Sequence, residues 1–211
     1  MKLFNFTFLL CCSCFACYAQ RFGGGGYFKI GYGWVTTTGI NQALSTPTQF
    51  STSVFNLGGG GYSYLNRLIL GGSGAVMLSN SKGDTLIIHG GGGFEFGYDV
   101  LSKPTTQLHA TLLLGGRGTN VQAGPNKSNH ISSNGVMVGA TLHLLQHVVF
   151  SPKDEKKIGG FQIGLRISAW TSLLSSSWKR NDGLKLTRIE SYQPSAIIIS
   201  ATFGGAGFRI Q

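Results

Sequence analysis

His130 and Ser132 are the two residues of this sequence whose spacing most directly suggests chemistry. They lie two positions apart, and an imidazole close to a serine hydroxyl can activate it as a nucleophile when an acid orients the ring. The first acidic residue after them is Asp154, in a charged stretch that is expected to form a turn. His130 itself is expected in a polar loop before a strand. We therefore expect no catalytic residues, and keep an acyl hydrolase using Ser132 and His130 as an alternative.

Four other histidines recur on one face of predicted strands, where Glu95 also lies. They are His89, His109, His143 and His147. Imidazole and carboxylate groups can bind a metal ion, but His143 and His147, the closest pair, would be about 13 Å apart along an extended strand. A hydrogen-bonded polar core explains them better. The sequence predicts no metal site and no cofactor.

Glu95 has three basic residues on the same predicted face: Lys29, Arg117 and Arg166. A buried carboxylate without a partner is very costly, so it needs cations close by. We expect Lys29, Glu95, Arg117 and Arg166 to form an ion-pair network inside the fold.

The elements that must position these groups alternate with a period of two, which is typical of strands. In residues 27–38, the large apolar side chains of Phe28, Ile30, Tyr32 and Trp34 occupy one face, and Lys29 lies on the other. The same alternation recurs in three further segments, at residues 107–119, 135–147 and 159–171. Four weaker segments complete a set of eight, at residues 51–65, 68–80, 85–100 and 195–210.

The eight segments predict an all-β fold, an eight-stranded antiparallel up-and-down transmembrane barrel. Each is long enough for a tilted membrane strand, which needs roughly 9 to 11 residues. Connections 39–50, 81–84, 120–134 and 172–194 are longer on average than those at 66–67, 101–106 and 150–157, as outer loops and periplasmic turns would be. Two local features are also expected. The glycines at 58–61 suggest a bulge, and five aromatic residues near segment ends suggest interfacial girdles: Tyr27, Tyr62, Tyr64, Tyr98 and Trp170.

Alternation alone does not say which face points inward. Eight strands enclose an interior just wide enough for side chains, so a membrane barrel would have a filled lumen containing the polar set. The inverse arrangement is a soluble periplasmic, lipocalin-like calyx, which would hold the large apolar residues inside. The low charge of the apolar faces favours lipid on the outside, and an outer-membrane location.

Residues 1–19 have the pattern of a signal peptide, with Lys2 before an apolar core and Ala19 before a cleavage point. Residues 20–211 would form the barrel domain. All four cysteines lie within the first 17 residues, so the mature chain would have none. A lipoprotein modified at Cys17 is the alternative.

The chain has 17 Lys and Arg against 7 Asp and Glu among 211 residues, a formal charge of +10. This balance suits acidic partners, but no basic cluster interleaved with aromatic residues indicates nucleic acid. The connection 172–194 has four cations: Lys179, Arg180, Lys185 and Arg188. These are the residues expected to contact anionic lipid, such as lipopolysaccharide, or a membrane protein partner.

Segments 26–33 (GYFKIGYG) and 92–98 (GGFEFGY), with a strand that ends the chain, resemble small outer-membrane β-barrel proteins of Gram-negative bacteria, particularly the glycine-rich eight-stranded type common in Bacteroidetes. The resemblance implies a non-enzymatic structural or binding component of the outer membrane. Residues 130–135 also look like the His-x-Ser stretch of lipid A deacylases, which implies the lipid A acyl hydrolase alternative.

Overall fold

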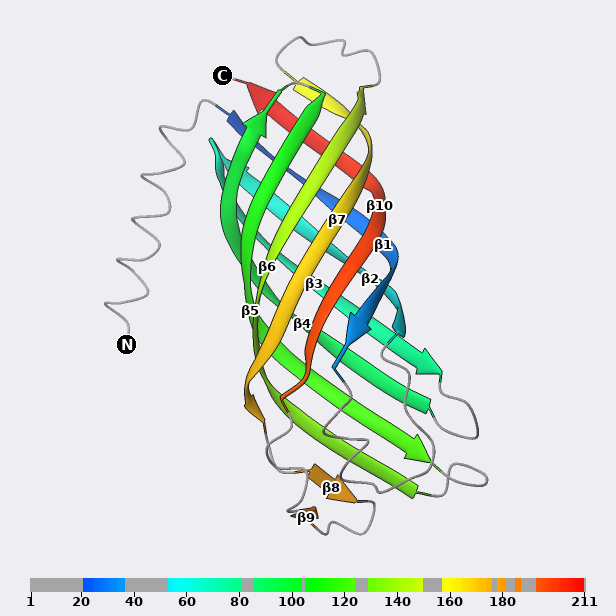
Figure 1. Ribbon diagram of the computed structural model, residues 1–211. Helices are drawn as coiled ribbons and strands as arrows, with labels where there is room; N and C mark the ends of the chain where they lie inside the picture. The colour runs from blue at the N-terminus through cyan, green and yellow to red at the C-terminus, as the bar shows by residue number, and fades with distance from the viewer. Residues whose placement is uncertain are drawn as a thin grey trace, which may run out of the picture.

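A single antiparallel sheet closes on itself to form the body of the molecule (Figure 1). The computed structural model describes residues 21–36, 53–80, 86–103, 105–123, 129–149, 157–175, 178–180, 185–186 and 193–210. The expected signal peptide, residues 1–19, lies outside these ranges. No membrane-crossing helix is present among the residues described.

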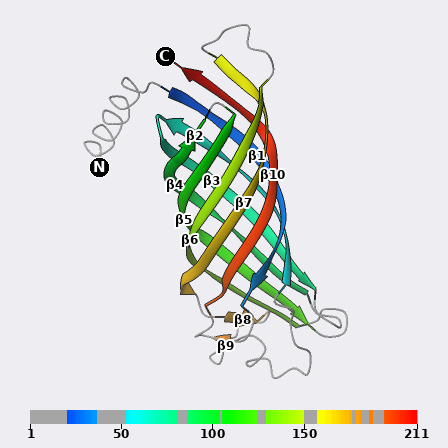
Figure 2. The ribbon, with the colours of Figure 1, turned by 45° about the horizontal axis from the view of Figure 1, so that its top comes forward.

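Eight long strands make up the barrel wall. They are β1 (Arg21–Val35), β2 (Ser53–Leu65), β3 (Leu68–Asn80), β4 (Leu86–Ser102), β5 (Thr106–Ala123), β6 (Asn129–Val149), β7 (Lys157–Ser175) and β10 (Ser195–Ile210). Each pairs with its neighbour in the chain, with β10 following β7, and β1 pairs with β10 from Arg21↔Ile210 to Val35↔Ala196. The predicted eight-stranded antiparallel barrel is therefore confirmed, and its strands tilt strongly around the axis (Figure 2).

The two ends of the barrel differ. The start of β1, the end of β10 and the β2–β3, β4–β5 and β6–β7 connections share one end, here the termini end, at the top of Figure 1. The other end, the loop end, joins β1 to β2, β3 to β4, β5 to β6 and β7 to β10. The β2–β3 hairpin turns through Asn66 and Arg67, and Asn66 has a φ of 60°, which an asparagine tolerates in a tight turn.

The prediction of a long connection over residues 120–134 was wrong, because β5 and β6 continue across most of this range. Ala123 pairs with Asn129, which leaves only residues 124–128 between the strands. Two short strands, β8 (Trp178–Arg180) and β9 (Lys185–Leu186), lie within the predicted 172–194 connection. β7 pairs with β6 as far as Gly135, and β8 pairs with β6 further on, at Ile131 and Ser132. β8 therefore takes the place of β7 beside the last part of β6 at the loop end.

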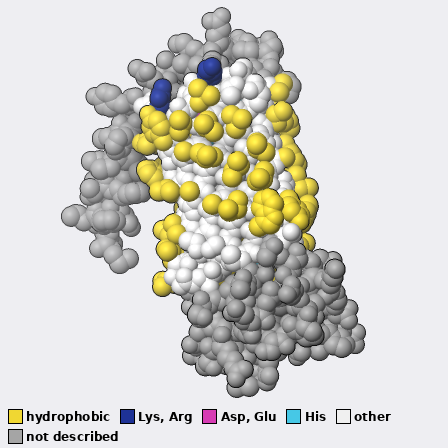
Figure 3. Space-filling view, in the orientation of Figure 1, with side chains coloured by type: hydrophobic (Ala, Val, Ile, Leu, Met, Phe, Trp, Pro, Cys, Tyr) yellow, Lys and Arg dark blue, Asp and Glu magenta, His cyan; other side chains and the backbone are white. Residues whose placement is uncertain are grey.

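The wall is apolar outside and mixed inside. Along β1, Phe28, Ile30, Tyr32 and Trp34 are exposed, while Lys29 is buried. On the face that Figure 3 shows, apolar side chains spread over the described wall, and we call this outer surface the apolar belt. The polar residues predicted inside are all buried in the lumen: Lys29, His89, Glu95, His109, Arg117, His143, Gln162 and Arg166. The barrel is thus inverted relative to a soluble calyx.

The expected aromatic girdle was wrong at four of its five positions. Tyr27, Tyr62, Tyr64 and Trp170 are buried in the lumen, and only Tyr98 is exposed. The reason is parity: Tyr27 is two residues from Lys29, so both side chains point to the same face of the strand.

The expected bulge in the glycine run 58–61 is also absent, because that run pairs with β1 and β3 in continuous register. Register shifts occur instead between Asp99 and Leu101 and between Val136 and Met137. The glycines allow close strand approach: a Cβ at Gly92 would lie 2.8 Å from the backbone oxygen of Ser73.

Candidate functional site

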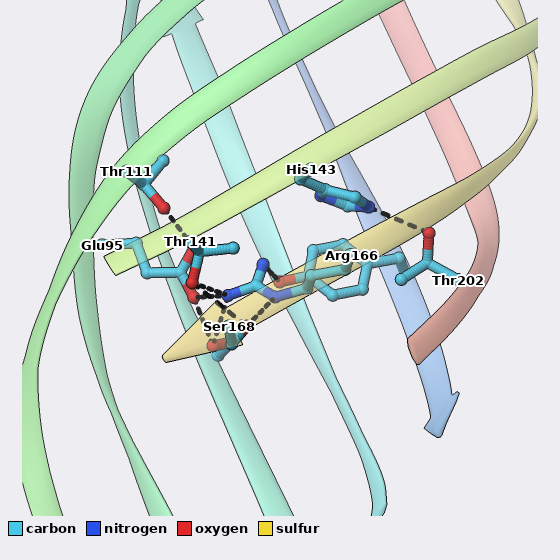
Figure 4. A network of polar contacts seen from close by, with 9 residues as sticks. Glu95, Thr111, Thr141, His143, Arg166, Ser168 and Thr202 are labelled. Atoms are coloured by element: carbon cyan, nitrogen blue, oxygen red, sulfur yellow. Dashed lines mark hydrogen bonds and ion pairs between the residues drawn. The ribbon is translucent and has the colours of Figure 1, made fainter. Parts of the chain in front are cut away.

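An ion pair between Glu95 and Arg166 lies in the middle of the lumen (Figure 4). Glu95 extends from β4 and Arg166 from β7, and both side chains are buried, with 7% and 3% exposed. The Glu95 carboxylate also accepts hydrogen bonds from the hydroxyls of Ser73 and Thr111. Three strands besides β7 therefore contribute to one buried carboxylate site.

Arg166 binds more than the carboxylate. Its guanidinium donates to Tyr27 Oη at 2.6 Å, Thr141 Oγ1 at 3.3 Å and Ser168 Oγ at 3.2 Å. Its Cζ lies 5.5 Å from the centre of the Tyr27 ring. A planar guanidinium with five donors can join several strands in this way. Arg166 therefore joins β7 to β1, β4 and β6.

Lys29 and Arg117 have different surroundings from Arg166. Arg117 lies towards the loop end, where it donates to Ser172 Oγ at 2.9 Å and Thr119 Oγ1 at 3.2 Å. Lys29 is buried close to Glu95, and the structure gives it no hydrogen bond to a described residue. Among the described residues, the ion pair at Glu95 is made by Arg166.

A cluster of aromatic and amide side chains fills the lumen at the termini end. Tyr64 donates to Gln107 and hydrogen bonds His109, and His147 Nε2 lies 3.0 Å from Gln107 Oε1. Tyr62 donates to Gln162. The rings of Tyr62, Tyr64 and His109 meet edge to face, with centroids 5.0 to 5.2 Å apart. Phe208 and Leu145 pack into the same cluster. We call it the termini plug, because it fills the lumen at the termini end.

Apolar side chains fill the lumen towards the loop end. Val35, Val54, Met77, Leu113, Met137, Trp170, Ala196 and Ile198 form one buried cluster. Beyond it, Val121, Ile131 and Trp178 are buried, with at most 4% exposed. The outward-facing neighbours here, Asn120 and Ser132, are polar. The pattern of apolar outside and polar inside therefore reverses where β5 and β6 extend past the apolar belt.

His130 and Ser132 lie in β6, so the expectation of a loop position for His130 was wrong. Both are half-buried on the outward face, and their partners on β5 are Gln122 and Asn120. The two described carboxylates, Glu95 and Asp99, are buried on the inward faces of the wall. Within the described residues, no acid is therefore placed to orient His130 towards Ser132.

The four cations of the 172–194 connection are only partly described. Lys179 lies in β8 and its side chain is exposed, and it pairs with Lys185 of β9. Arg180 is in β8, opposite Ile131. Arg188 lies outside the described residues. The structure thus places three of these residues on the small sheet β8–β9 at the loop end.

Two apolar grooves lie on the outside of the wall. One, of about 780 Å³, runs past Trp34, Leu112, Ala140, Ala169 and Ile197; the other, of about 650 Å³, shares Leu112, Ala140 and Ala169 with it. The register explains them, because Leu112, Ala140, Ala169 and Ile197 are consecutive cross-strand partners, and the two alanines lie between bulkier neighbours. The side chains that line both grooves are mainly apolar.

The lumen histidines do not gather around a common point for a metal. His143 Nε2 lies 2.9 Å from Thr202 Oγ1, and His89 Nδ1 lies 2.9 Å from Thr119 Oγ1. Among the residues that the structure describes, no group of three His, Cys, Asp or Glu side chains is arranged to hold a metal ion.

The sequence pattern did not identify the tyrosines as parts of the lumen. Tyr27, Tyr62 and Tyr64 were placed in the girdle because aromatic residues are common there. The available signal was their parity with Lys29 and Asn56, which are buried on the same strands. A hydroxyl on an inward position is also easier to satisfy in a polar lumen than in hydrocarbon.

No protein-family description and no curated protein matches this chain. Among solved structures it is similar to the outer membrane protein OprG from Pseudomonas aeruginosa, with a TM-score of 0.46 and 11% sequence identity. The similarity covers 92% of this chain and 97% of that one.

Proposed function

We propose that this protein is a non-enzymatic β-barrel of the outer membrane, exported by residues 1–19, that acts as a structural or binding component. The observation that carries the proposal is the inverted wall: a closed sheet with an apolar belt outside and charged groups inside. In water the exposure of so much apolar surface would favour aggregation, whereas a bilayer covers it.

A filled lumen argues against bulk transport. Eight strands leave an interior that side chains fill, and here the termini plug and the apolar cluster lie at different heights of it. Lipid is therefore the first partner, through the belt and the two grooves around Ala140 and Ala169.

The loop end offers a second contact, with an acidic partner. Lys179, Arg180 and Lys185 lie on the small sheet β8–β9 at the loop end. Ammonium and guanidinium groups bind phosphates and carboxylates through charge-assisted hydrogen bonds, which suits a lipopolysaccharide or an acidic membrane protein partner. We include Arg188 among the residues of this proposed contact because it lies in the same connection of the sequence.

Fractionation of cells that make the protein tests the location. We expect recovery with the outer membrane, and a folded band that migrates differently before and after boiling in detergent. Recovery as a detergent-free soluble species would overturn the proposal and favour a ligand-binding calyx.

Binding to purified lipopolysaccharide in detergent tests the loop end. We expect the variant Lys179→Gln/Arg180→Gln/Lys185→Gln to bind several-fold more weakly than the parent. Arg67→Gln/Lys103→Gln/Lys157→Gln is the matched control, because it also removes three cations and all three lie at the termini end. Equal loss in both variants would show that net charge alone causes the binding, and no loss in either would remove the loop-end contact.

A further inference from the structure

A small cavity lies in the lumen between the Glu95–Arg166 pair and Arg117. Its volume is about 40 Å³, which is room for about two or three water molecules or one small monatomic anion. On one side β4 supplies only glycines, Gly90, Gly91 and Gly92, so the wall there carries no side chain. On other sides the polar lining consists of Lys29, Asn56, Ser73, Arg117, Arg166 and Ser200, with Ser168.

The charges around this cavity are of one sign. Three cationic side chains line it, and each is more than nine-tenths buried: Lys29 is 7% exposed, Arg117 5% and Arg166 3%. No carboxylate is among the described lining residues. The Glu95 carboxylate lies next to the cavity and is hydrogen bonded to Arg166 and two hydroxyls. Among the described residues at the cavity, Glu95 is therefore the one carboxylate beside three cations.

Lys29 is the residue that most needs a further partner. Its side chain lines the cavity, and the described residues give it no hydrogen bond. Glu95 attracts Lys29, but its carboxylate is already ion-paired with Arg166, and a buried ammonium with only a shared counter-charge is costly. An anion in the cavity would supply the missing charge. Ser200 Oγ, which accepts from Asn56 Nδ2 at 3.1 Å, still has its own proton to donate to such an anion.

We propose that this cavity binds a small monovalent anion, chloride or a halide of similar size, between the Lys29 ammonium and the guanidinium groups of Arg117 and Arg166. The volume excludes a lipid headgroup or a sugar phosphate. The anion would be a resident counter-ion that stabilises the closed lumen, which is a property separate from the contacts proposed for the loop end.

The first test uses the purified barrel, folded in detergent and exchanged into sodium gluconate. Sodium chloride then replaces gluconate at constant ionic strength, and the midpoint of thermal unfolding is followed. We expect a saturable rise of about 5 to 10 °C at a chloride concentration of about 100 times the dissociation constant. The ³⁵Cl NMR line should broaden with the protein present, and bromide should compete. An unchanged midpoint together with an unbroadened line would overturn the proposal.

The variant Lys29→Met tests the site itself, and Lys179→Met is the matched control because Lys179 is exposed at the loop end. Lys29→Met should abolish the chloride response and melt above the parent in gluconate, since it removes a buried cation that shares the Glu95 carboxylate with Arg166. Lys179→Met should respond like the parent. If Lys29→Met does not fold, Ser200→Ala replaces it and should weaken the response several-fold. A response retained in the cavity variant, or lost equally in Lys179→Met, would contradict the site.

Discussion

The guanidinium of Arg166 and the carboxylate of Glu95 meet inside the barrel from strands β7 and β4, between which β5 and β6 complete the wall. The pair therefore connects parts of the wall that share no backbone hydrogen bonds. We therefore expect that replacing either residue lowers the stability of the whole barrel.

Replacing Glu95 with alanine should lower the unfolding midpoint by about 10 °C, because breaking a buried pair leaves Arg166 uncompensated at a cost of about 3 to 5 kcal/mol. The measurement is the temperature at which the compact gel band is lost. The double variant Glu95→Ala/Arg166→Met should recover much of the loss, since neither charge then remains unpaired. A Glu95→Ala protein that melts like the parent would show that the pair does not stabilise the lumen.

Tyr64→Phe should destabilise the termini plug by about 1 to 3 kcal/mol, because its hydroxyl binds both Gln107 and His109 and their buried atoms would lose a partner. Thermal unfolding in detergent measures this. Tyr98→Phe is the control, because Tyr98 is exposed in the belt and should change the midpoint little. Equal effects from the two variants would argue against the plug.

A charged side chain on the outer face should have little effect on folding at the loop end, and should destabilise the folded barrel within the apolar belt. Leu142→Arg and Asn134→Arg are a matched pair, because both residues are exposed on the outward face of β6. Leu142→Arg should cost about 2 to 4 kcal/mol in a bilayer and reduce the folded yield, while Asn134→Arg should fold like the parent. Similar yields would place the bilayer boundary elsewhere on β6.

Ser132→Ala should leave the acyl-chain pattern of lipid A unchanged in cells that make the protein. The physical reason is that His130 and Ser132 have neutral partners, Gln122 and Asn120, and the described carboxylates face the lumen. Mass spectrometry of extracted lipid A is the measurement, with cells lacking the protein as the baseline. Deacylation that requires Ser132 would establish the hydrolase alternative.

The strand pattern could be predicted from the sequence where the two faces differ most. Segments 68–80 and 195–210 match β3 and β10 at both ends. The ends of β5 and β6 could not be predicted in this way. Their apolar side chains point outward at Leu112 but inward at Val121 and Ile131. When the apolar side chains change from one face of a strand to the other, the alternation is interrupted, and the sequence pattern then predicts that the strand ends there.

The lumen was only partly predictable. The parity of Lys29, Glu95 and Arg166 placed them inside, but which cation pairs with Glu95 depends on the tilt of the strands and the register around the barrel. Tyrosines fit both an interface and a polar lumen by type, so parity had to decide their position.

The tryptophans of the chain can report which face of the barrel wall points towards lipid. Trp34 is 49% exposed in the belt, whereas Trp170 is buried in the lumen. Two single-tryptophan proteins, Trp170→Phe/Trp178→Phe and Trp34→Phe/Trp178→Phe, would be folded into bilayers with brominated acyl chains. We predict strong fluorescence quenching of Trp34 and little quenching of Trp170. Quenching of Trp170 with protection of Trp34 would mean that the apolar face points inward, and would contradict the account.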